Sequence, residues 1–169
     1  MSIAESLLPE FDHEMDNTRR TLERVPEARF QWKPHPRSGT LGWLATHLAE
    51  LPAWAINTIE QDSLDISPGG RPPQLVQSAV TLSEVLEAFE RNRVRARATI
   101  AGASDAVLFQ PWTLLNNGRI VFAMPRAAVL RGQIFNHLVH HRGQLTVYLR
   151  LNDVPVPDLY GPSADEGSM

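Results

Sequence analysis

The sequence VLRGQIFNHLVHHRGQLTVYLRL, residues 129–151, repeats its apolar residues at the three- and four-residue spacing of a helix. It also contains a histidine cluster, His137, His140 and His141. Residues four apart lie on one face of a helix, so His137 and His141 point the same way while His140 is rotated off that face. This segment predicts a long helix from Arg126 to Leu151 that carries a pair of imidazoles at metal-ligand spacing.

A further histidine, His47, lies far upstream in another apolar segment. Packing of the two helices can bring His47 to the depth of the pair and complete a set of three nitrogen ligands. Three protein ligands leave positions open for water or substrate, which is typical of catalytic rather than closed structural sites. A buried histidine is, however, commonly a hydrogen-bonded core residue, so the spacing by itself leaves both interpretations open.

Side chains near these histidines have two interpretations as well. Trp43 and Trp54 flank His47 and are typical of helix packing, with lining of a pocket as the alternative. Polar side chains close to the histidines can orient a ligand imidazole through its second ring nitrogen, or can be ordinary polar surface. These polar residues are Glu50, Gln133, Asn136 and Gln144.

The same periodicity predicts three more helices in this chain of 169 residues. Thr81 and Glu84 form a capping box at the start of one of them. Pro52 should kink another, because proline lacks an N–H and clashes with the preceding turn. Four helices most economically form a four-helix bundle, so the predicted fold class is all-α. The three additional helices cover residues Ile3–Val25, Leu41–Glu60 and Leu82–Ile100.

A small β-hairpin is expected immediately before the last helix. Residues 112–125, WTLLNNGRIVFAMP, contain two β-prone runs around Asn116, Asn117 and Gly118. An Asn-Gly pair between such runs is typical of a tight turn whose residues need positive φ.

The proline and glycine residues within 26–40 and 61–80 indicate that these two segments are connecting loops. The C-terminal residues 154–169 are expected to be extended and partly disordered. We therefore predict a single domain over residues 1–160, followed by a flexible tail over residues 161–169.

The composition of the chain argues against several classes of function. A chain of this length with 43% hydrophobic residues can bury a core without a structural metal, so a metal here would be functional. The net charge of -3 and the lack of a basic domain argue against nucleic-acid binding. No apolar run is long enough for a membrane span, and a soluble, cytoplasmic protein is expected. Without any cysteine, thiol chemistry would need a thiol from outside the protein.

Two common hydrolase patterns are missing from the sequence. The residues between His137 and His141 are Leu138, Val139 and His140, so the glutamate of the H-E-x-x-H zinc proteases is absent. No serine lies in a nucleophile-elbow context, which argues against a Ser-His-Asp triad.

Three segments together resemble the DinB/YfiT-like family: LGWLATHLAE (41–50), FNHLVHHRGQL (135–145) and LNDVPVPDLYGPSADE (151–166). The resemblance implies an up-down-down-up four-helix bundle that is commonly a homodimer. It also implies a divalent metal held by three histidines, with nickel or zinc favoured over manganese or iron. Carried over residue by residue, the ligands would be His47, His137 and His141.

The resemblance also implies a chemistry, because characterised members of the family include S-transferases that use low-molecular-weight thiols and a mycothiol-dependent maleylpyruvate isomerase. Our leading hypothesis is that the metal activates an exogenous thiol for attack on an electrophilic small molecule. One alternative is a metal-water hydrolase in which Glu50 or His140 shuttles protons. Another is a non-catalytic stress protein that binds a metal or a small ligand.

Overall fold

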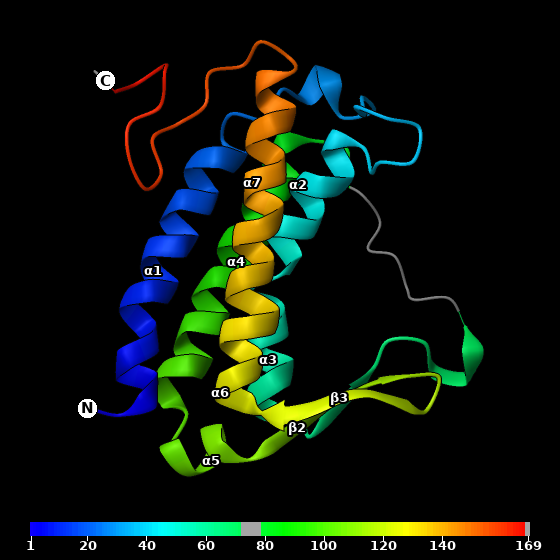
Figure 1. Ribbon diagram of the computed structural model, residues 1–169, viewed down its shortest axis with the longest axis vertical. Coiled ribbons are helices and arrows are strands. Elements are labelled where there is room, and N and C mark those ends of the chain that lie inside the picture. Colours follow the sequence, from blue (N-terminus) through cyan, green and yellow to red (C-terminus); the bar gives the residue numbers. More distant parts are fainter. Residues whose placement is uncertain (72–78, 168–169) are drawn as a thin grey trace.

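The computed structural model describes residues 1–71 and 79–167 (Figure 1). Within these residues the chain is mostly helical, with a small three-stranded sheet at one end of the helices. The helices are α1 (Ile3–Leu22), η1 (Glu27–Arg29), α2 (Leu41–Glu50), α3 (Ala53–Glu60), η2 (Pro68–Gly70), α4 (Leu82–Gly102), α5 (Asp105–Phe109), α6 (Arg126–Val129), η3 (Leu130–Phe135) and α7 (Asn136–Arg150). The strands are β1 (Ser63–Asp65), β2 (Pro111–Asn116) and β3 (Arg119–Pro125). Residues 72–78 of the predicted second loop and residues 168–169 of the predicted tail lie outside the described residues.

The helix starts follow the local signals in the sequence. The predicted capping box at Thr81 and Glu84 is formed at the first turn of α4. Thr40 caps α2 by accepting a hydrogen bond from the Trp43 backbone N–H. The predicted helix Leu41–Glu60 is divided at Pro52 into α2 and α3, because the proline ring cannot continue the hydrogen bonds of the preceding turn.

The predicted helix from Arg126 is continuous through α6, η3 and α7. The middle part, η3, is π-helical, which the apolar spacing did not predict. Segments of this kind are rare inside α-helices and occur often at functional sites. Here the segment ends two residues before His137.

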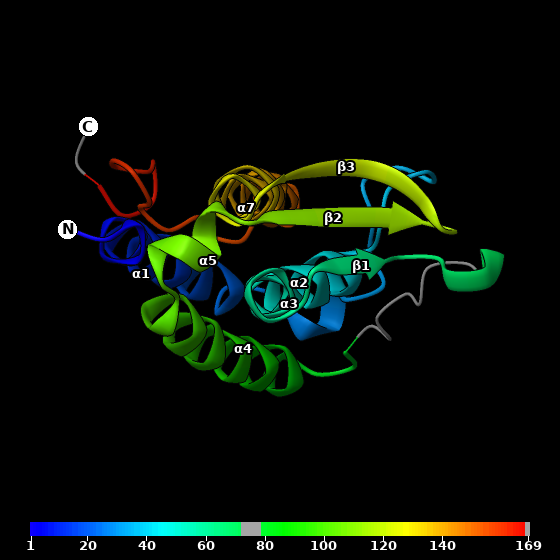
Figure 2. The ribbon, with the colours of Figure 1, turned by 90° about the horizontal axis from the view of Figure 1, so that it is seen from below.

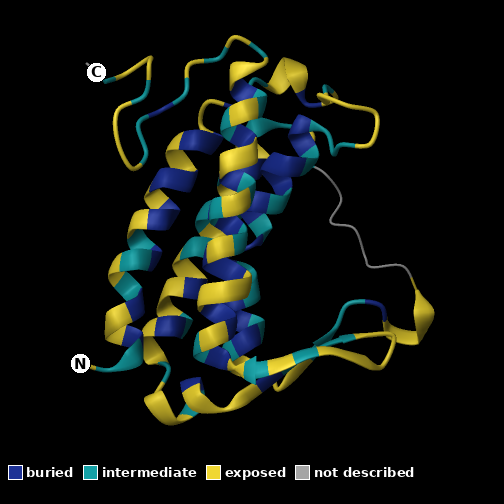
Figure 3. Cartoon of the chain, viewed as in Figure 1, coloured by how far each residue is buried: buried dark blue, intermediate teal, exposed yellow. Residues whose placement is uncertain are grey.

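The long helices pack side by side around one core. Figure 2 shows α2 and α3 between α4 and α7, and contacts also join α1 to α4 and α7. The inward-facing sides are buried along the whole length of the helices (Figure 3). No helix in the described ranges is long and apolar enough to cross a bilayer. Large core residues are Phe11, Met15, Leu44, Leu48, Phe89, Ile100, Leu138 and Leu145.

The predicted hairpin is present as β2 and β3, which pair antiparallel and extend sideways from one end of the helices (Figure 1). Asn117 and Gly118 have φ values of 51° and 71°, as the turn requires. The sheet has a third strand, however, because β1 pairs parallel to β2. The prediction of a hairpin alone was therefore incomplete, since a three-residue strand is too short to produce a visible alternation.

Asp65 at the end of β1 binds the hairpin turn. Its carboxylate accepts hydrogen bonds from the backbone N–H groups of Ser67 (2.9 Å), Gly118 (2.8 Å) and Asn117 (2.9 Å). These donors lower the pKa of Asp65, so the carboxylate stays charged and holds the hairpin against β1.

A buried ion pair joins α7 to α1. The Arg142 guanidinium donates to the Glu14 carboxylate at 2.5 Å, to the Glu14 carbonyl oxygen at 2.9 Å and to Thr18 Oγ1 at 3.1 Å. The Tyr160 hydroxyl accepts from Arg142 and donates to Glu14 at 2.8 Å. Thus α1, α7 and the C-terminal segment share one polar network.

The C-terminal residues make further ion pairs with the helices. Asp165 pairs with Arg150 at 2.5 Å, and Glu166 pairs with Arg24 and, at 3.4 Å, with Arg20. The boundary between a domain ending at residue 160 and a tail over 161–169 stays a prediction.

We expect Arg142→Met to lower the free energy of unfolding by about 3–5 kcal/mol, because the Glu14 carboxylate would remain buried without its cationic partner. Urea unfolding monitored by circular dichroism measures the loss. The control is Arg131→Met, which removes an exposed pair with Glu10 and should cost less than about 1 kcal/mol. Equal losses in the two variants would contradict a special role for the buried pair.

Candidate metal centre

The three predicted ligands meet in the structure, although His47 is 90 residues away from His137. One ring nitrogen from each of His47, His137 and His141 lies within 4.8 Å of the other two. His137 Nε2 is 2.8 Å from His141 Nε2 and 3.4 Å from His47 Nε2. The packing of α2 against α7 therefore forms a three-histidine cluster that is compatible with metal binding.

Hydrogen bonds orient two of the rings. Gln144 Oε1 accepts a hydrogen bond from His141 Nδ1 at 2.7 Å. The backbone carbonyl of Gln133, one turn before His137, accepts a hydrogen bond from the His137 ring. A proton held on the far nitrogen leaves the Nε2 lone pair of each ring directed into the cluster. Of the polar neighbours predicted to do this, Gln144 acts through its side chain and Gln133 through its backbone.

The electrostatics of the cluster favour neutral imidazoles. Partial burial, with a smaller effect from charge on His141 and His137, lowers the pKa of His47 from 6.5 to about 4. Burial is also the main cause of the lowered pKa of His137 and of His141. All three rings are therefore neutral near pH 7, and neutral imidazole is the form that binds metals.

The donor set fits a divalent cation. Two Nε2 lone pairs only 2.8 Å apart repel each other unless a proton or a cation lies between them. A cation bound by all three nitrogens removes this repulsion, and imidazole suits zinc, nickel, copper and iron.

Two tryptophans border the cluster. The Trp43 ring stacks on His47 with centroids 5.1 Å apart and an interplanar angle of 8°. It is nearly perpendicular to the His141 ring, with centroids 6.2 Å apart. Trp54 approaches His137 edge-on at 6.5 Å. Both rings also pack against the hydrophobic core. Helix packing is therefore correct for both residues, and Trp54 also lines the cavity beside His137, whereas Trp43 does not.

Beside His137 lies a cavity of about 190 Å³. Trp112, Leu114 and Phe122 of the hairpin line one side of it. The helical side consists of Trp54, Val129, Gln133, Ile134 and His137. Trp112 is buried, and its Nε1 has no hydrogen-bond partner among the described residues, which costs about 1–3 kcal/mol for a buried donor. Sequence reasoning assigned Trp112 only to the hairpin, because period-two alternation does not show what the strand faces.

The two predicted proton shuttles lie near the cluster. His140 is exposed, as its rotation off the ligand face predicts, and its ring centroid is 4.9 Å from that of His141. Glu50 lies at the end of α2 and is partly buried, and no hydrogen bond joins it to an imidazole in the described part of the chain. The remaining histidines, His13 and His35, are exposed and lie outside the three-histidine cluster.

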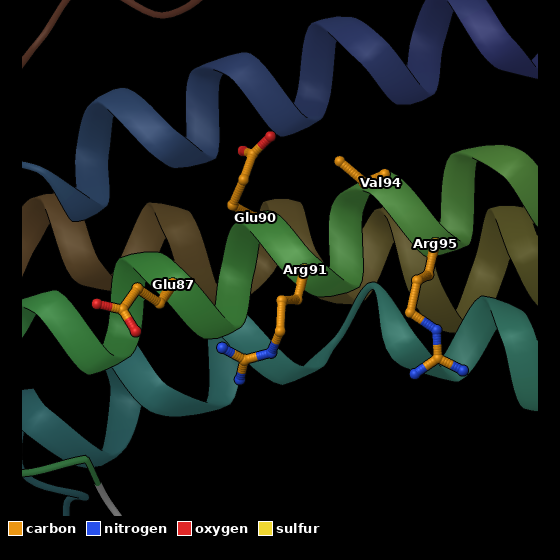
Figure 4. A pocket seen from close by; sticks show the side chains of 5 residues that line it. All are labelled: Glu87, Glu90, Arg91, Val94 and Arg95. Atoms are coloured by element: carbon orange, nitrogen blue, oxygen red, sulfur yellow. The ribbon is translucent and has the colours of Figure 1, made fainter.

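A second depression, of about 610 Å³, lies over α4 and is open to solvent. Figure 4 shows that all of its labelled side chains come from this one helix. It combines two acidic and two basic side chains with one valine and contains no histidine, so it is an ordinary charged helix surface. These residues are Glu87, Glu90, Arg91, Val94 and Arg95.

These features define a helical protein with a three-histidine candidate metal centre beside a small apolar cavity. The chain belongs to the DinB superfamily, whose sequence profile matches residues 10–145. The resemblance inferred from the three sequence segments is thereby confirmed.

Two solved structures support the fold. A DinB-like protein from Bacillus cereus superposes with a TM-score of 0.70 at 20% sequence identity, covering 92% of this chain and 97% of the other. A DinB-like protein from Bacillus subtilis gives a TM-score of 0.69 at 16% identity, with coverages of 93% and 99%. The comparison with curated proteins finds no match.

The lowered pKa of His47 predicts a pH-dependent stability for the metal-free protein. Between pH 6.5 and about 4 the unfolded chain binds more protons at this residue than the folded chain does, so stability falls as the pH falls. Allowing for the partial exposure of the ring, we expect His47 to contribute a loss of about 1 kcal/mol on going from about pH 7.5 to about pH 5. Urea unfolding after chelator treatment measures it. The variant His47→Asn should show a shallower pH dependence, and an unchanged dependence would contradict the assignment.

Proposed function

We propose that this protein is a divalent-metal-dependent enzyme that transfers a low-molecular-weight thiol to a small electrophile. The metal would be held by His47, His137 and His141. The observation that carries the proposal is the convergence of three neutral imidazoles whose Nε2 atoms lie 2.8 Å and 3.4 Å apart along the cluster.

The donor set supports catalysis rather than a purely structural role. The chain supplies three ligands, so positions remain open for an incoming molecule. When bound, a divalent cation with three neutral ligands keeps its positive charge and lowers the pKa of a thiol or a water molecule that reaches it. A closed structural site would instead use four protein ligands.

The surrounding side chains have positioning roles in this proposal. Gln144 and the Gln133 carbonyl hold His141 and His137 with their Nε2 atoms directed inward. Trp43 packs flat on His47 and prevents rotation of that ring, and Trp54 covers His137. The cavity beside His137 offers space for the electrophile next to the cluster.

Any thiol that takes part in the reaction has to come from outside the protein. The chain has no cysteine, so the nucleophilic sulfur has to belong to a co-substrate. The thiol loses its proton as its sulfur forms a bond to the electrophile, and the electron pair displaced at the attacked atom leaves with a leaving group or, in an addition, stays on the electrophile and takes up a proton. We assign His140 as the group that accepts this proton, because it lies beside His141 and is open to solvent. In the metal-water hydrolase alternative, Glu50 or His140 would shuttle protons.

The proposal also includes the identity of the metal, the order of the helices, the location of the protein and its oligomeric state. We propose nickel or zinc as the metal, an up-down-down-up four-helix bundle and a cytoplasmic homodimer, all carried over from the family resemblance. The side-by-side packing of α1, α2 with α3, α4 and α7 supports the bundle.

Elemental analysis of protein purified without an affinity tag tests the metal centre. We expect about one metal ion per chain. We also expect its loss in His47→Ala, His137→Ala and His141→Ala, since removal of one ligand leaves too few donors. The control is His35→Ala, which should keep the metal. A parent protein that contains no metal and takes up neither nickel, zinc nor manganese would refute the site.

The ring-orienting role of Gln144 has its own test. Gln144→Met keeps the length of the side chain but removes the acceptor for His141 Nδ1. We expect the metal affinity to fall by about 10–100-fold, because a ligand imidazole that loses its orienting partner binds less tightly. Competition with a coloured chelator measures the affinity. An affinity equal to that of the parent would show that the hydrogen bond does not orient the ligand.

Steady-state assays separate the candidate activities. With 1-chloro-2,4-dinitrobenzene as the electrophile and a panel of low-molecular-weight thiols, turnover should require both thiol and metal and should disappear in His137→Ala. Hydrolysis of 4-nitrophenyl acetate without thiol would favour a metal-water hydrolase. A filled site with no turnover under either condition would favour a non-catalytic binding protein.

A further inference from the structure

The three-histidine cluster lies in the seam between α2 and α7. On α2 only Trp43, His47 and Glu50 are not fully buried, and they follow each other at the four- and three-residue spacing of one helix face. Both Trp43 and His47 contact His141 of α7. The accessible side of the cluster therefore follows this seam.

The two ends of the seam differ in their chemistry. Figure 1 shows the loop of residues 26–40 and the hairpin at opposite ends of the long helices. Trp43, on the side of the loop, stacks on His47. Trp54, on the side of the hairpin, lies nearly perpendicular to His137 and lines the cavity there. The cluster thus lies between this loop and a cavity whose lining includes no arginine, lysine or carboxylate.

The loop is packed closely against its end of the seam. A Cβ added at Gly39 would lie 2.4 Å from the Trp43 ring, so the loop can approach the indole this closely only with a glycine. The Tyr148 hydroxyl of α7 donates a hydrogen bond to the Gly39 carbonyl oxygen at 3.3 Å, and Trp32 packs edge-on against Tyr148. About seven residues of helix, or about 10 Å along the axis, separate the end of the loop from His47.

This loop carries a concentrated positive charge. Arg29, Lys33 and Arg37 are exposed, and the sequence has no acidic residue between Glu27 and Glu50. None of the three cations forms an ion pair in the described part of the chain. The Glu27 carboxylate instead accepts a hydrogen bond from a backbone N–H at the start of α4. In a chain with a net charge of -3, the loop is therefore a local positive region that attracts anions.

Two of the cations belong to one short turn. The Lys33 ammonium donates a hydrogen bond at 3.1 Å to the carbonyl oxygen of Pro36, the residue before Arg37. The Arg37 backbone N–H donates to His35 Nδ1 at 3.2 Å. Prolines on both sides of His35 restrict the backbone, because each proline ring fixes its own φ. An ammonium and a guanidinium group thus extend from one restricted turn, and both are available to a carboxylate.

We propose that the basic turn formed by Lys33, His35 and Arg37 binds a carboxylate of the thiol co-substrate. The thiol is accordingly a small anionic molecule whose sulfur reaches the three-histidine cluster while its carboxylate stays at the turn. A molecule the size of a tripeptide spans about 10–11 Å when extended, which matches the separation of the loop from the cluster. The uncharged cavity at the other end of the seam is left for the electrophile. The description of the ligand as a co-substrate rests on the proposed function, whereas anion binding at the turn does not.

Two thioethers test the role of charge without a thiol that could bind a metal as a thiolate. S-methylglutathione keeps both carboxylates of a tripeptide thiol, and its dimethyl ester has neither charge. Isothermal titration calorimetry with the protein as purified measures the two affinities. We expect S-methylglutathione to bind about five- to twentyfold more tightly than the ester, and its affinity to fall as the salt concentration rises. Inorganic phosphate should bind more weakly than S-methylglutathione, because it contacts the turn alone.

Matched variants locate the anion site. Lys33→Gln combined with Arg37→Gln removes two positive charges from the turn, and should weaken S-methylglutathione about five- to twentyfold without changing the affinity of the ester. The control combines Arg91→Gln with Arg95→Gln, which removes the same charge from exposed positions on α4 (Figure 4). Because α4 lies on the other side of α2 from α7 (Figure 2), the control should bind both thioethers as the parent does. Thermal unfolding checks that both double variants are folded.

Several outcomes would overturn the assignment of the basic turn. These are equal affinities for S-methylglutathione and its ester, no heat of binding with either thioether at millimolar concentration, an affinity for phosphate equal to that for S-methylglutathione, and equal losses in the two double variants.

Steady-state assays distinguish this inference from the proposed function. With 1-chloro-2,4-dinitrobenzene as the electrophile, Lys33→Gln combined with Arg37→Gln should raise the KM for glutathione and leave kcat unchanged. The KM for 2-mercaptoethanol, which has no carboxylate, should stay the same. Charge-dependent binding at the turn in a protein without thiol-dependent turnover would refute the proposed function alone. Turnover whose KM for glutathione is the same in the parent and this variant would refute the role of the turn alone.

Discussion

The buried pair of Arg142 and Glu14 is the constraint on which the position of α7 depends. Successive residues of a helix point about 100° apart, so Arg142 and its neighbour His141 face different partners. Arg142 reaches α1, while His141 faces His47 on α2. A rotation of α7 that turned Arg142 away from α1 would leave the buried Glu14 carboxylate without its cationic partner, which is strongly unfavourable. The ion pair thereby selects the rotation of α7 that presents both histidines to α2.

This packing holds the ring nitrogens of three histidines close together. Packing brings the Nε2 atoms of His47, His137 and His141 together, and burial keeps the rings neutral. The Nε2 lone pairs of His137 and His141 repel each other in the folded chain, and a bound cation would remove this repulsion. Because Gln144 and the Gln133 carbonyl already orient two of the rings, little reorganisation is needed when a ligand binds.

The small sheet adds a second element to this arrangement. Asp65 binds the turn of the hairpin through backbone N–H groups, and β1 follows α3 after a short connection, so the hairpin has a defined position relative to the helices. That position places Trp112 over the strip of helix surface that ends at His137. The hairpin therefore forms one wall of the cavity beside the candidate metal centre.

The features that the sequence by itself determined are those governed by short-range backbone geometry. The capping box at Thr81, the break at Pro52, the turn at Gly118 and the shared face of His137 and His141 each depend on residues a few positions apart. Tertiary structure alone decided the approach of His47 to the pair, the pairing of β1 with β2, the burial of Arg142 and the unpaired indole N–H of Trp112. These depend on which surfaces pack together over long separations in the chain, and the spacing of residues along a helix or strand does not encode that choice.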